Sequence, residues 1–282
     1  MNVKTSSRYN LRFQRLSTTL LRSVLIAVLG SVVVLTAGCS TSDTPARRFS
    51  EILYRYPDTQ EPLRIKKLTA SSYSDVAPAQ SRTVTVMVHP AYSLFFREEH
   101  RSSYSEAKYD LLKFQLDSEA RFISEIAKTD NLLILVLPGN FQKESIAPLS
   151  YTYYLNASAG AGASVFYLTS ETWSSGTLTS DAMVTLYGFL QKVGANRMLI
   201  GGGYIGRCQR EFYNQVSAYV DRTTAYIVPE ISSISPDDIS DQESAEILAS
   251  LRRKDYTPVK KFIEKKSQGA ANVLQLPSAP GI

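Results

Sequence analysis

Apolar and polar residues are arranged along the chain in segments that predict strands and helices in turn. The segment RTVTVMV at 82–88 is rich in β-branched residues, and NLLILVL at 131–137 is a continuous apolar run. Both are typical of strands, the second of a strand buried in a parallel sheet. Between them, apolar residues at helical spacing predict a long amphipathic helix over Tyr104–Lys128. Further strands and helices are predicted, alternately, at 164–168, 180–193, 197–200, 208–220, 225–228 and 240–251.

Strands that alternate with helices favour a parallel sheet covered by helices on both faces. We therefore expect an α/β fold of three layers, Rossmann-like in its general arrangement, in one domain over residues 82–251. Residues 39–81 are interpreted as a polar tether and lead-in. Residues 252–282 are interpreted as a short C-terminal helix around KKFIEKK and a disordered tail rich in Ala, Pro and Ser.

The N-terminal segment has a basic start, an apolar stretch after Arg22 and the ending LTAGC at 35–39. The stretch is short for a transmembrane helix, which needs about 20 apolar residues. The ending resembles the lipobox of bacterial lipoproteins. This resemblance implies that residues 1–38 are a cleaved signal peptide and that Cys39 carries acyl lipid, such as palmitate, which holds the protein to a membrane. The alternative is an uncleaved signal anchor that happens to end in a cysteine.

The resemblance to lipoproteins also bears on localisation and charge. Ser40 follows the cysteine, where an Asp is associated with inner-membrane retention, so the outer membrane of the cell envelope is favoured over the inner one. The chain has 31 basic and 26 acidic residues, and five of the basic ones but none of the acidic ones lie in residues 1–38. The remaining chain is therefore formally neutral, which gives no general support for nucleic-acid binding.

The stretch from 176 to 233 resembles the isochorismatase-like cysteine hydrolases in the order of its features. Gly176-Thr177-Leu178 precedes a helix, the Gly201–Gly203 turn follows a strand, Cys208 opens the next helix, and Glu230 follows the last strand. The first strand and its aromatic ending, TVMVHPAYSLFF, also resemble the opening strand of that family. The resemblance covers roughly 82–245. It implies an isochorismatase-like fold with Cys208 as nucleophile toward an amide or ester carbonyl.

The mechanism of that family also uses an Asp at the end of the first strand as base and a Lys after the third strand. Here His89 stands at the Asp position, and no lysine lies near Thr169. Since two of three catalytic residues are absent, we expect a catalytically degenerate domain, or pseudoenzyme. One hypothesis retains an active site, with His89 as base to Cys208, whose thiolate a helix N-terminus would favour. The alternative is a cysteine that only fills buried space.

Sites in open parallel sheets gather at the carboxyl ends of the strands. A binding site there would draw on Glu171 after the third strand, Glu230 after the fifth, and four residues after the fourth: Gly202, Gly203, Tyr204 and Arg207. The triple glycine lacks the spacing of a phosphate-binding loop, so close backbone approach or positive φ is its favoured role. Arg207 could bind an anion, but a surface ion pair with Glu211 is favoured.

No group of His, Cys and carboxylate residues has the spacing of metal ligands, and we expect neither a metal nor a cofactor. The aromatic residues at Tyr151–Tyr154 are interpreted as packing, with a recognition surface as the alternative. The preferred hypothesis is a lipid-anchored protein whose degenerate α/β domain binds another envelope protein or a small ligand. The alternatives are an envelope cysteine hydrolase acting through Cys208 and a structural subunit of an envelope assembly. The oligomeric state does not follow from the sequence.

Overall fold

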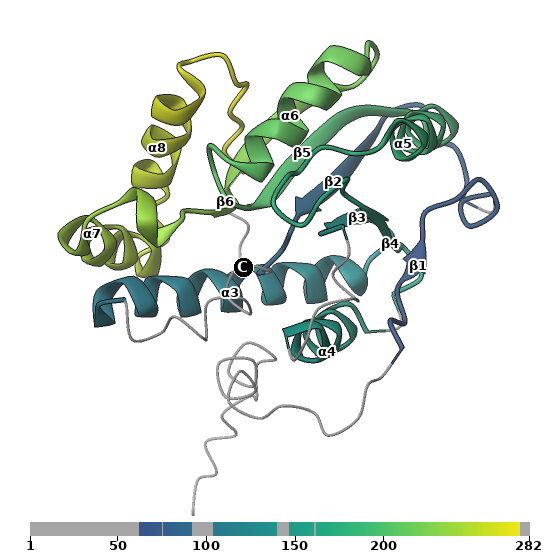
Figure 1. Cartoon of the computed structure of the whole chain (residues 1–282). Helices are drawn as coiled ribbons and strands as arrows, with labels where there is room; N and C mark the ends of the chain where they lie inside the picture. The colour runs from purple at the N-terminus through teal and green to yellow at the C-terminus, as the bar shows by residue number, and fades with distance from the viewer. Residues whose placement is uncertain (1–61, 75, 92–103, 140–146, 161, 277–282) are drawn as a thin grey trace, which may run out of the picture. The chain divides into compact units, whose positions relative to one another are not determined.

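The structure is a computed structural model that describes residues 62–74, 76–91, 104–139, 147–160 and 162–276 (Figure 1). The strands are β1 (Lys66–Lys67), β2 (Arg82–Val88), β3 (Leu132–Leu137), β4 (Val165–Thr169), β5 (Ala195–Gly203) and β6 (Thr224–Ser233). The helices are α3 (Glu106–Ala127), α4 (Ala147–Ala159), α5 (Ser180–Val193), α6 (Cys208–Tyr219), the 3₁₀ turn η2 (Pro236–Asp238), α7 (Asp241–Arg252) and α8 (Thr257–Ser267). Cys39 and the predicted signal peptide lie outside the described residues.

The strands form one parallel sheet in the order β1-β4-β3-β2-β5-β6. From β2 in the middle, the chain moves outward through β3 and β4, then crosses to β5 on the other side of β2 and ends at β6. The strand order therefore reverses between β2 and β5, which is the place where open α/β sheets form a crevice for ligands. The expected fold class, a parallel α/β sheet, is confirmed.

Two apolar cores cover the two faces of the sheet, because successive strand side chains point in opposite directions. Val84, Val86 and Val88 pack on the side of α5 and α6, whereas Met87 packs on the side of α3 and α4. Figure 1 shows these two pairs of helices on opposite faces of the sheet. Beyond the β6 edge, α7 lies against α3, and α8 lies against β6 and α7.

The structure adds two elements that the sequence analysis does not contain. Lys66 and Lys67, assigned to the lead-in, extend the sheet as β1 beside β4. The segment 147–159 is the helix α4, whose sequence APLSYTYYLNASA has no polar face at helical spacing and so gives no amphipathic signal. Tyr151 and Tyr154 in this helix are fully buried, as the packing interpretation requires.

The predicted disordered tail is wrong for residues 272–276, which run beside β6. Ile227 N donates to Asn272 O at 2.8 Å, and Leu274 N donates to Ile227 O at 3.1 Å. Val273 and Leu274 pack against the two apolar cores. The pairing covers an edge strand that would otherwise leave backbone N–H and C=O groups unpaired, which composition alone does not reveal.

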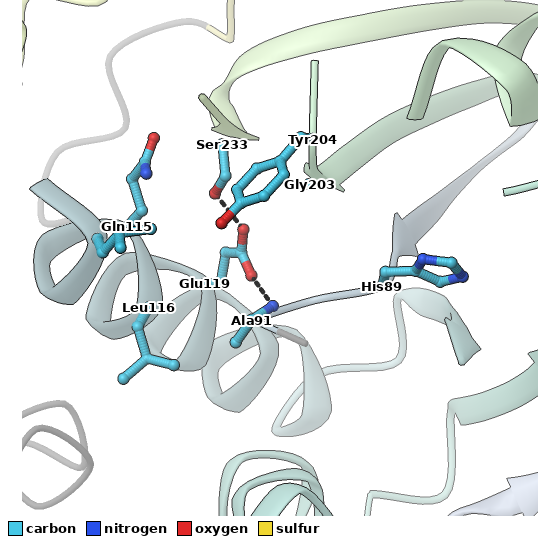
Figure 2. Close-up of a pocket in the computed structure, with 9 residues that line it drawn as sticks. His89, Ala91, Gln115, Leu116, Glu119, Gly203, Tyr204 and Ser233 are labelled. Carbon is cyan, nitrogen blue, oxygen red and sulfur yellow. Dashed lines mark hydrogen bonds between the residues drawn. The ribbon is translucent and has the colours of Figure 1, made fainter. Parts of the chain in front are cut away.

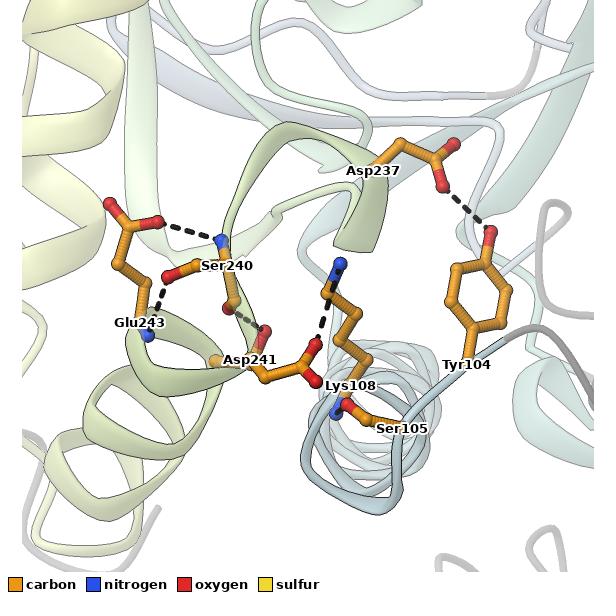
Figure 3. Close-up of polar contacts among 8 residues, drawn as sticks. Tyr104, Ser105, Lys108, Asp237, Ser240, Asp241 and Glu243 are labelled. Carbon is orange, nitrogen blue, oxygen red and sulfur yellow. Dashed lines mark hydrogen bonds and ion pairs between the residues drawn. The ribbon is translucent and has the colours of Figure 1, made fainter.

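The turn η2 connects elements that lie far apart in the sequence. Tyr104 Oη, just before α3, donates to Asp237 Oδ1 at 2.9 Å (Figure 3). The carboxylate of Asp238 lies 3.0 Å from Arg207 Nη2 and 3.6 Å from Lys266 Nζ. Next along the chain, Ser240 forms a capping box with Glu243 at the start of α7. The partner that the structure shows for Arg207 is therefore Asp238, where Glu211 was expected.

The triple glycine at the end of β5 allows the backbones of β2 and β5 to approach closely. Gly202 has a φ of +84°, and a β-carbon there would lie 2.1 Å from Val88 O. A β-carbon on Gly201 would lie 2.5 Å from Ile231 O. The interpretation of this motif as a site of close approach and positive φ is confirmed.

Candidate functional site

The carboxyl ends of β2, β5 and β6 meet at the point where the strand order reverses, and α3 crosses beside them (Figure 2). A small cavity, the carboxyl-edge cavity, lies between α3 and these strand ends. Its volume is about 20 Å³, and about 10–15 Å³ suffices for a water molecule. It has room for water but not for a substrate of metabolite size. Its lining residues are His89, Ala91, Leu112, Gln115, Leu116, Glu119, Gly203, Tyr204 and Ser233.

Glu119 is the most unusual residue of this cavity because a carboxyl group is buried there, only 3% exposed. Its Oε2 accepts from Ala91 N at 2.6 Å, and its Oε1 accepts from the hydroxyl of Ser233 (Figure 2). Desolvation by burial raises its pKa to about 7, although both hydrogen bonds act in the opposite direction. Glu119 thus joins α3 to the segment after β2 and to the end of β6.

Glu119 is not among the site residues predicted from the sequence, although the apolar pattern of α3 marks it as a buried charge. The apolar positions Leu112, Leu116 and Ile123 of α3 lie on one helix face, and position 119 falls on the same face. A charged residue within such an apolar stripe is a buried polar group that needs partners. Gln115, one turn earlier, follows the same rule: its amide exchanges two hydrogen bonds with the backbone of Ile234, at 2.7 and 3.1 Å.

A second cavity, also of about 20 Å³, shares Gln115, Glu119 and Ser233 with the first and extends toward α7 and α8. Glu230 lines this second cavity, and its Oε1 accepts from Leu276 N at 3.1 Å. Partial burial raises the pKa of Glu230. The structure therefore separates Glu230 from His89: the two residues line neighbouring cavities, one on each side of the Gln115–Glu119 ridge.

His89, the expected base, is fixed by Ser170. The two side chains are joined by a 2.9 Å hydrogen bond between His89 Nε2 and Ser170 Oγ. Ser170 donates its single hydroxyl hydrogen to Thr172 O at 2.6 Å and accepts from Gly139 N at 3.1 Å. Nε2 of His89 must therefore carry a hydrogen and donate it. Desolvation lowers the pKa of His89 to about 3, so the imidazole is neutral, and its ring points away from Glu119 (Figure 2).

Cys208, the expected nucleophile, opens α6 as predicted, but its thiol is buried and hydrogen-bonded to the backbone. Its Sγ donates to Gly203 O at 2.7 Å and accepts from Tyr204 N at 3.0 Å. The thiol pins the turn between β5 and α6, where the Gly203–Tyr204 peptide is cis. Cys208 is not among the residues that line either cavity.

The loop between β4 and α5 contributes to the burial of Cys208. A β-carbon on Gly176 would lie 1.9 Å from Cys208 O, so this loop rests directly on the first residue of α6. Glu211 holds the loop in place, because its Oε2 accepts from Ser175 Oγ at 2.7 Å and from Gly176 N at 3.0 Å. The loop therefore packs against the backbone at the first residue of α6.

Two opposing effects act on the thiol, and burial is the larger. A helix N-terminus stabilises an anion by roughly 0.3–1 kcal/mol. Desolvation raises the pKa of Cys208 from 9.0 to about 11, which corresponds to about 3 kcal/mol against the thiolate. The thiolate expected from the position of Cys208 at a helix start is therefore not favoured at neutral pH.

The remaining predicted site residues are dispersed. Gly203 and Tyr204 line the carboxyl-edge cavity, and Gly202 O accepts from Gln209 Nε2 at 3.2 Å. Arg207 lies in the ion pair with Asp238. Glu171 is exposed in the loop after β4. The structure thus gathers His89, Gly203 and Tyr204 around one cavity and leaves Arg207, Glu171 and Glu230 outside it.

Membrane-spanning helices and metal sites are both absent from the described residues. None of the helices in those residues is both long and apolar enough to cross a membrane. No cluster of three or more His, Cys, Asp or Glu side chains in the same part of the chain has the arrangement of a metal site.

The buried carboxyl of Glu119 predicts that stability falls as pH rises. In the unfolded chain a Glu ionises near pH 4.5, whereas Glu119 in the folded protein holds its proton to about pH 7. Between these values the folded state binds more protons, so the free energy of unfolding decreases with rising pH, on the order of 3 kcal/mol for this group. Glu119→Gln preserves the shape, and its amide can accept from Ala91 N and donate to Ser233 Oγ. This variant should remove this part of the decrease in denaturant titrations from pH 4 to 8.

Asp117 provides the matched comparison for this measurement. Its pKa is also raised to about 7, chiefly by burial, although Arg121 and Lys113 lower it. Asp117→Asn should therefore remove a separate part of the same decrease, one that begins at a lower pH because an unfolded Asp ionises near pH 3.8. A wild-type stability that rises from pH 5 to 7, or a Glu119→Gln variant with an unchanged slope, would contradict the assignment.

Comparisons with known proteins give no family for the chain. No protein-family model matches it, and no curated protein matches it. Among solved structures, it is similar to an octameric hydrolase of unknown specificity from Escherichia coli, with 12% identity and a TM-score of 0.43 over 71% of this chain and 78% of that one. It is also similar to a cysteine hydrolase from Pseudomonas syringae pv. phaseolicola, with 12% identity and a TM-score of 0.34 over 74% of this chain and 100% of that one. At these values neither similarity identifies a family or an activity.

Proposed function

We propose that this chain is a lipid-anchored envelope protein whose α/β domain binds another envelope component and does not act as a cysteine hydrolase. The anchor is inferred from the lipobox-like ending at Cys39, and the absence of hydrolysis from the state of Cys208. The domain has the order of features of a cysteine hydrolase. The side chains at its strand ends, however, are hydrogen-bonded to other parts of the fold.

The observation that carries the proposal is that Cys208 and His89 are each committed to another partner. The thiol donates to Gly203 O, and the imidazole Nε2–H donates to Ser170 Oγ. A nucleophilic cysteine needs a base that accepts its proton and a pKa low enough for thiolate to form. Burial opposes both requirements, because it raises the pKa of Cys208 and lowers that of His89.

The size of the carboxyl-edge cavity favours a protein partner over a small ligand. Small-molecule sites typically enclose roughly 300–1,000 Å³, far more than the volume at Glu119. An exposed aromatic side chain is present in a loop that follows a strand end of the same sheet: Trp173, between β4 and α5, is 52% exposed. Tryptophan is enriched among the residues that contribute most to protein interfaces. We therefore assign the binding surface to the loop between β4 and α5.

Slow alkylation of Cys208 is the first expected outcome. In the mature lipidated protein, where Cys39 carries no free thiol, a maleimide or iodoacetamide probe should react with Cys208 at pH 6 at a small fraction of its rate in the denatured chain, because reaction needs thiolate and access. The measurement is the labelled fraction over time by mass spectrometry. Rapid labelling of the folded protein at pH 6, or turnover of an amide or ester that Cys208→Ala abolishes, would establish the hydrolase instead.

Site-specific cross-linking tests the assigned surface. A photo-reactive amino acid at position 173 should yield adducts with an envelope protein in intact cells. Tyr219 is the matched control: it is 50% exposed, and it ends α6 at the opposite edge of the sheet from Cys208. Adducts from position 173 and none from 219, compared by gel mobility and mass spectrometry, support the proposal. Equal adducts from both positions, or adducts from 219 alone, argue against this surface.

A further inference from the structure

The end of α7 and the start of α8 carry a concentration of positive charge that the neutral composition of the mature chain conceals. Residues 252–261, RRKDYTPVKK, contain five basic residues and one acidic residue. Arg252, Arg253, Lys254 and Lys261 are exposed. We call these residues, with Lys260, the basic turn. Since the whole segment from residue 39 on is formally neutral, this surface has a strong local excess of charge.

The electrostatic neighbours of the basic turn indicate that its charges lie together in space. The pKa of Asp255 is lowered chiefly by hydrogen bonds from Thr257, and also by the nearby charges of Arg253 and Lys261. Tyr256 is half-buried and lies within the electrostatic range of the partly buried Glu230 and of Arg121 on α3. A sixth basic residue from another element, exposed on α3, thus joins the same surface. Tyr256, within the same segment, is an aromatic residue of the kind found at membrane–water interfaces.

Helix stability does not account for the basic turn. Arg252 and Arg253 end α7, where cations stabilise a helix. Lys260 and Lys261, however, lie near the start of α8, whose first turn contains no acidic residue. Cations near a helix N-terminus oppose the helix dipole, and the Lys260–Glu264 pair, at 4.0 Å, is long and exposed. The stability of the fold therefore does not explain why these basic residues lie together. Binding to an external anionic surface would explain it.

The described chain begins in the same layer of the molecule as Arg121. Asn156 of α4 accepts from Arg64 N at 2.8 Å and donates to Pro62 O at 3.0 Å, so the N-terminal end of the domain is fixed to α4. Helices α3 and α4 cover the same face of the sheet (Figure 1). The 23 residues from Cys39 to residue 61 could extend roughly 75–80 Å, so a lipid on Cys39 leaves this face free to reach the bilayer.

We propose that the basic turn and Arg121 dock the domain on the anionic phospholipid headgroups of the membrane that holds its lipid. This inference rests on the proposed anchor at Cys39 for the choice of a membrane over other polyanions. Each basic residue near an anionic bilayer strengthens binding by roughly five-fold, and the effect weakens with salt. The tether and the basic surface act together in holding the domain on the membrane.

The experiment uses the mature lipidated protein in vesicles of phosphatidylcholine alone or with added phosphatidylglycerol. A fluorophore is placed through Ala249→Cys, an exposed position on α7, and its quenching by nitroxide-labelled headgroups reports docking. Quenching should be several-fold greater in the anionic vesicles and should fall at raised salt. It should be lost in the doubly substituted Arg253→Gln, Lys261→Gln protein. The matched control, Lys192→Gln with Arg222→Gln, removes two exposed charges from the α5–α6 side and should retain quenching.

Equal quenching in the two kinds of vesicle, or equal loss in the control protein, would overturn the proposal. Tighter binding to duplex DNA or to peptidoglycan sacculi than to anionic vesicles, at equal anionic charge, would also overturn it. The intact mass of the reconstituted protein tests the anchor separately. If the mass lacks lipid, the anchor is wrong, and flotation of the same chain with anionic vesicles still decides whether the basic turn binds them.

Discussion

Exclusion of water from the carboxyl edge of the sheet is the constraint that determines the protonation and the hydrogen bonding of the side chains there. The edge contains a histidine, a glutamate and a cysteine, which are the side chains from which hydrolytic sites are built. Burial disfavours the charged form of each one, lowering the pKa of His89 and raising those of Glu119 and Cys208. Each polar group then makes a hydrogen bond within the fold, because an unpaired buried group would be costly.

The same bonds explain how the surrounding elements are held. Ser170 ties the end of β4 to His89 and to Gly139, and Glu119 ties α3 to Ala91 and Ser233. Cys208 ties the first residue of α6 back to the end of β5. A catalytic site needs groups that change protonation or partner during a reaction. Here a change in any one of these three groups would loosen a junction between a strand and its neighbours, which is the physical basis of the proposed structural use of the site.

Much of the fold could be predicted from the sequence because its signals are local. The apolar runs of β2 and β3 and the helical spacing of α3 require only neighbouring residues. Other features depend on distant contacts: β1 is two lysines whose strand conformation comes from β4, and residues 272–276 pair with β6 although they lie in a tail rich in Ala, Pro and Ser. Helix α4 lacks an amphipathic pattern because its Ser, Thr and Asn residues are not gathered on one face of the helix.

The position of the candidate site could be predicted from the sequence, but the protonation and hydrogen-bond partners of its side chains could not. Its place at the strand ends, the opening of α6 at Cys208 and the close approach at Gly202 follow from residue order and glycine chemistry. The partners of the polar groups do not, because Ser170 and Glu119 lie 81 and 114 positions along the chain from His89 and Ser233, respectively. The sequence position of Cys208 suggested a thiolate, and the burial of the thiol in the folded domain reverses that expectation.

The protonation state of His89 tests the central claim most directly. The chain has two histidines, so the imidazole nitrogen-15 resonances of His89 can be assigned by comparison with a His89→Gln variant and followed through pH. The account predicts a neutral ring, with the hydrogen on Nε2, from pH 8 down to the lowest pH at which the protein stays folded. An imidazolium at pH 7 that disappears in Cys208→Ala would reveal a thiolate–imidazolium pair and would contradict the account.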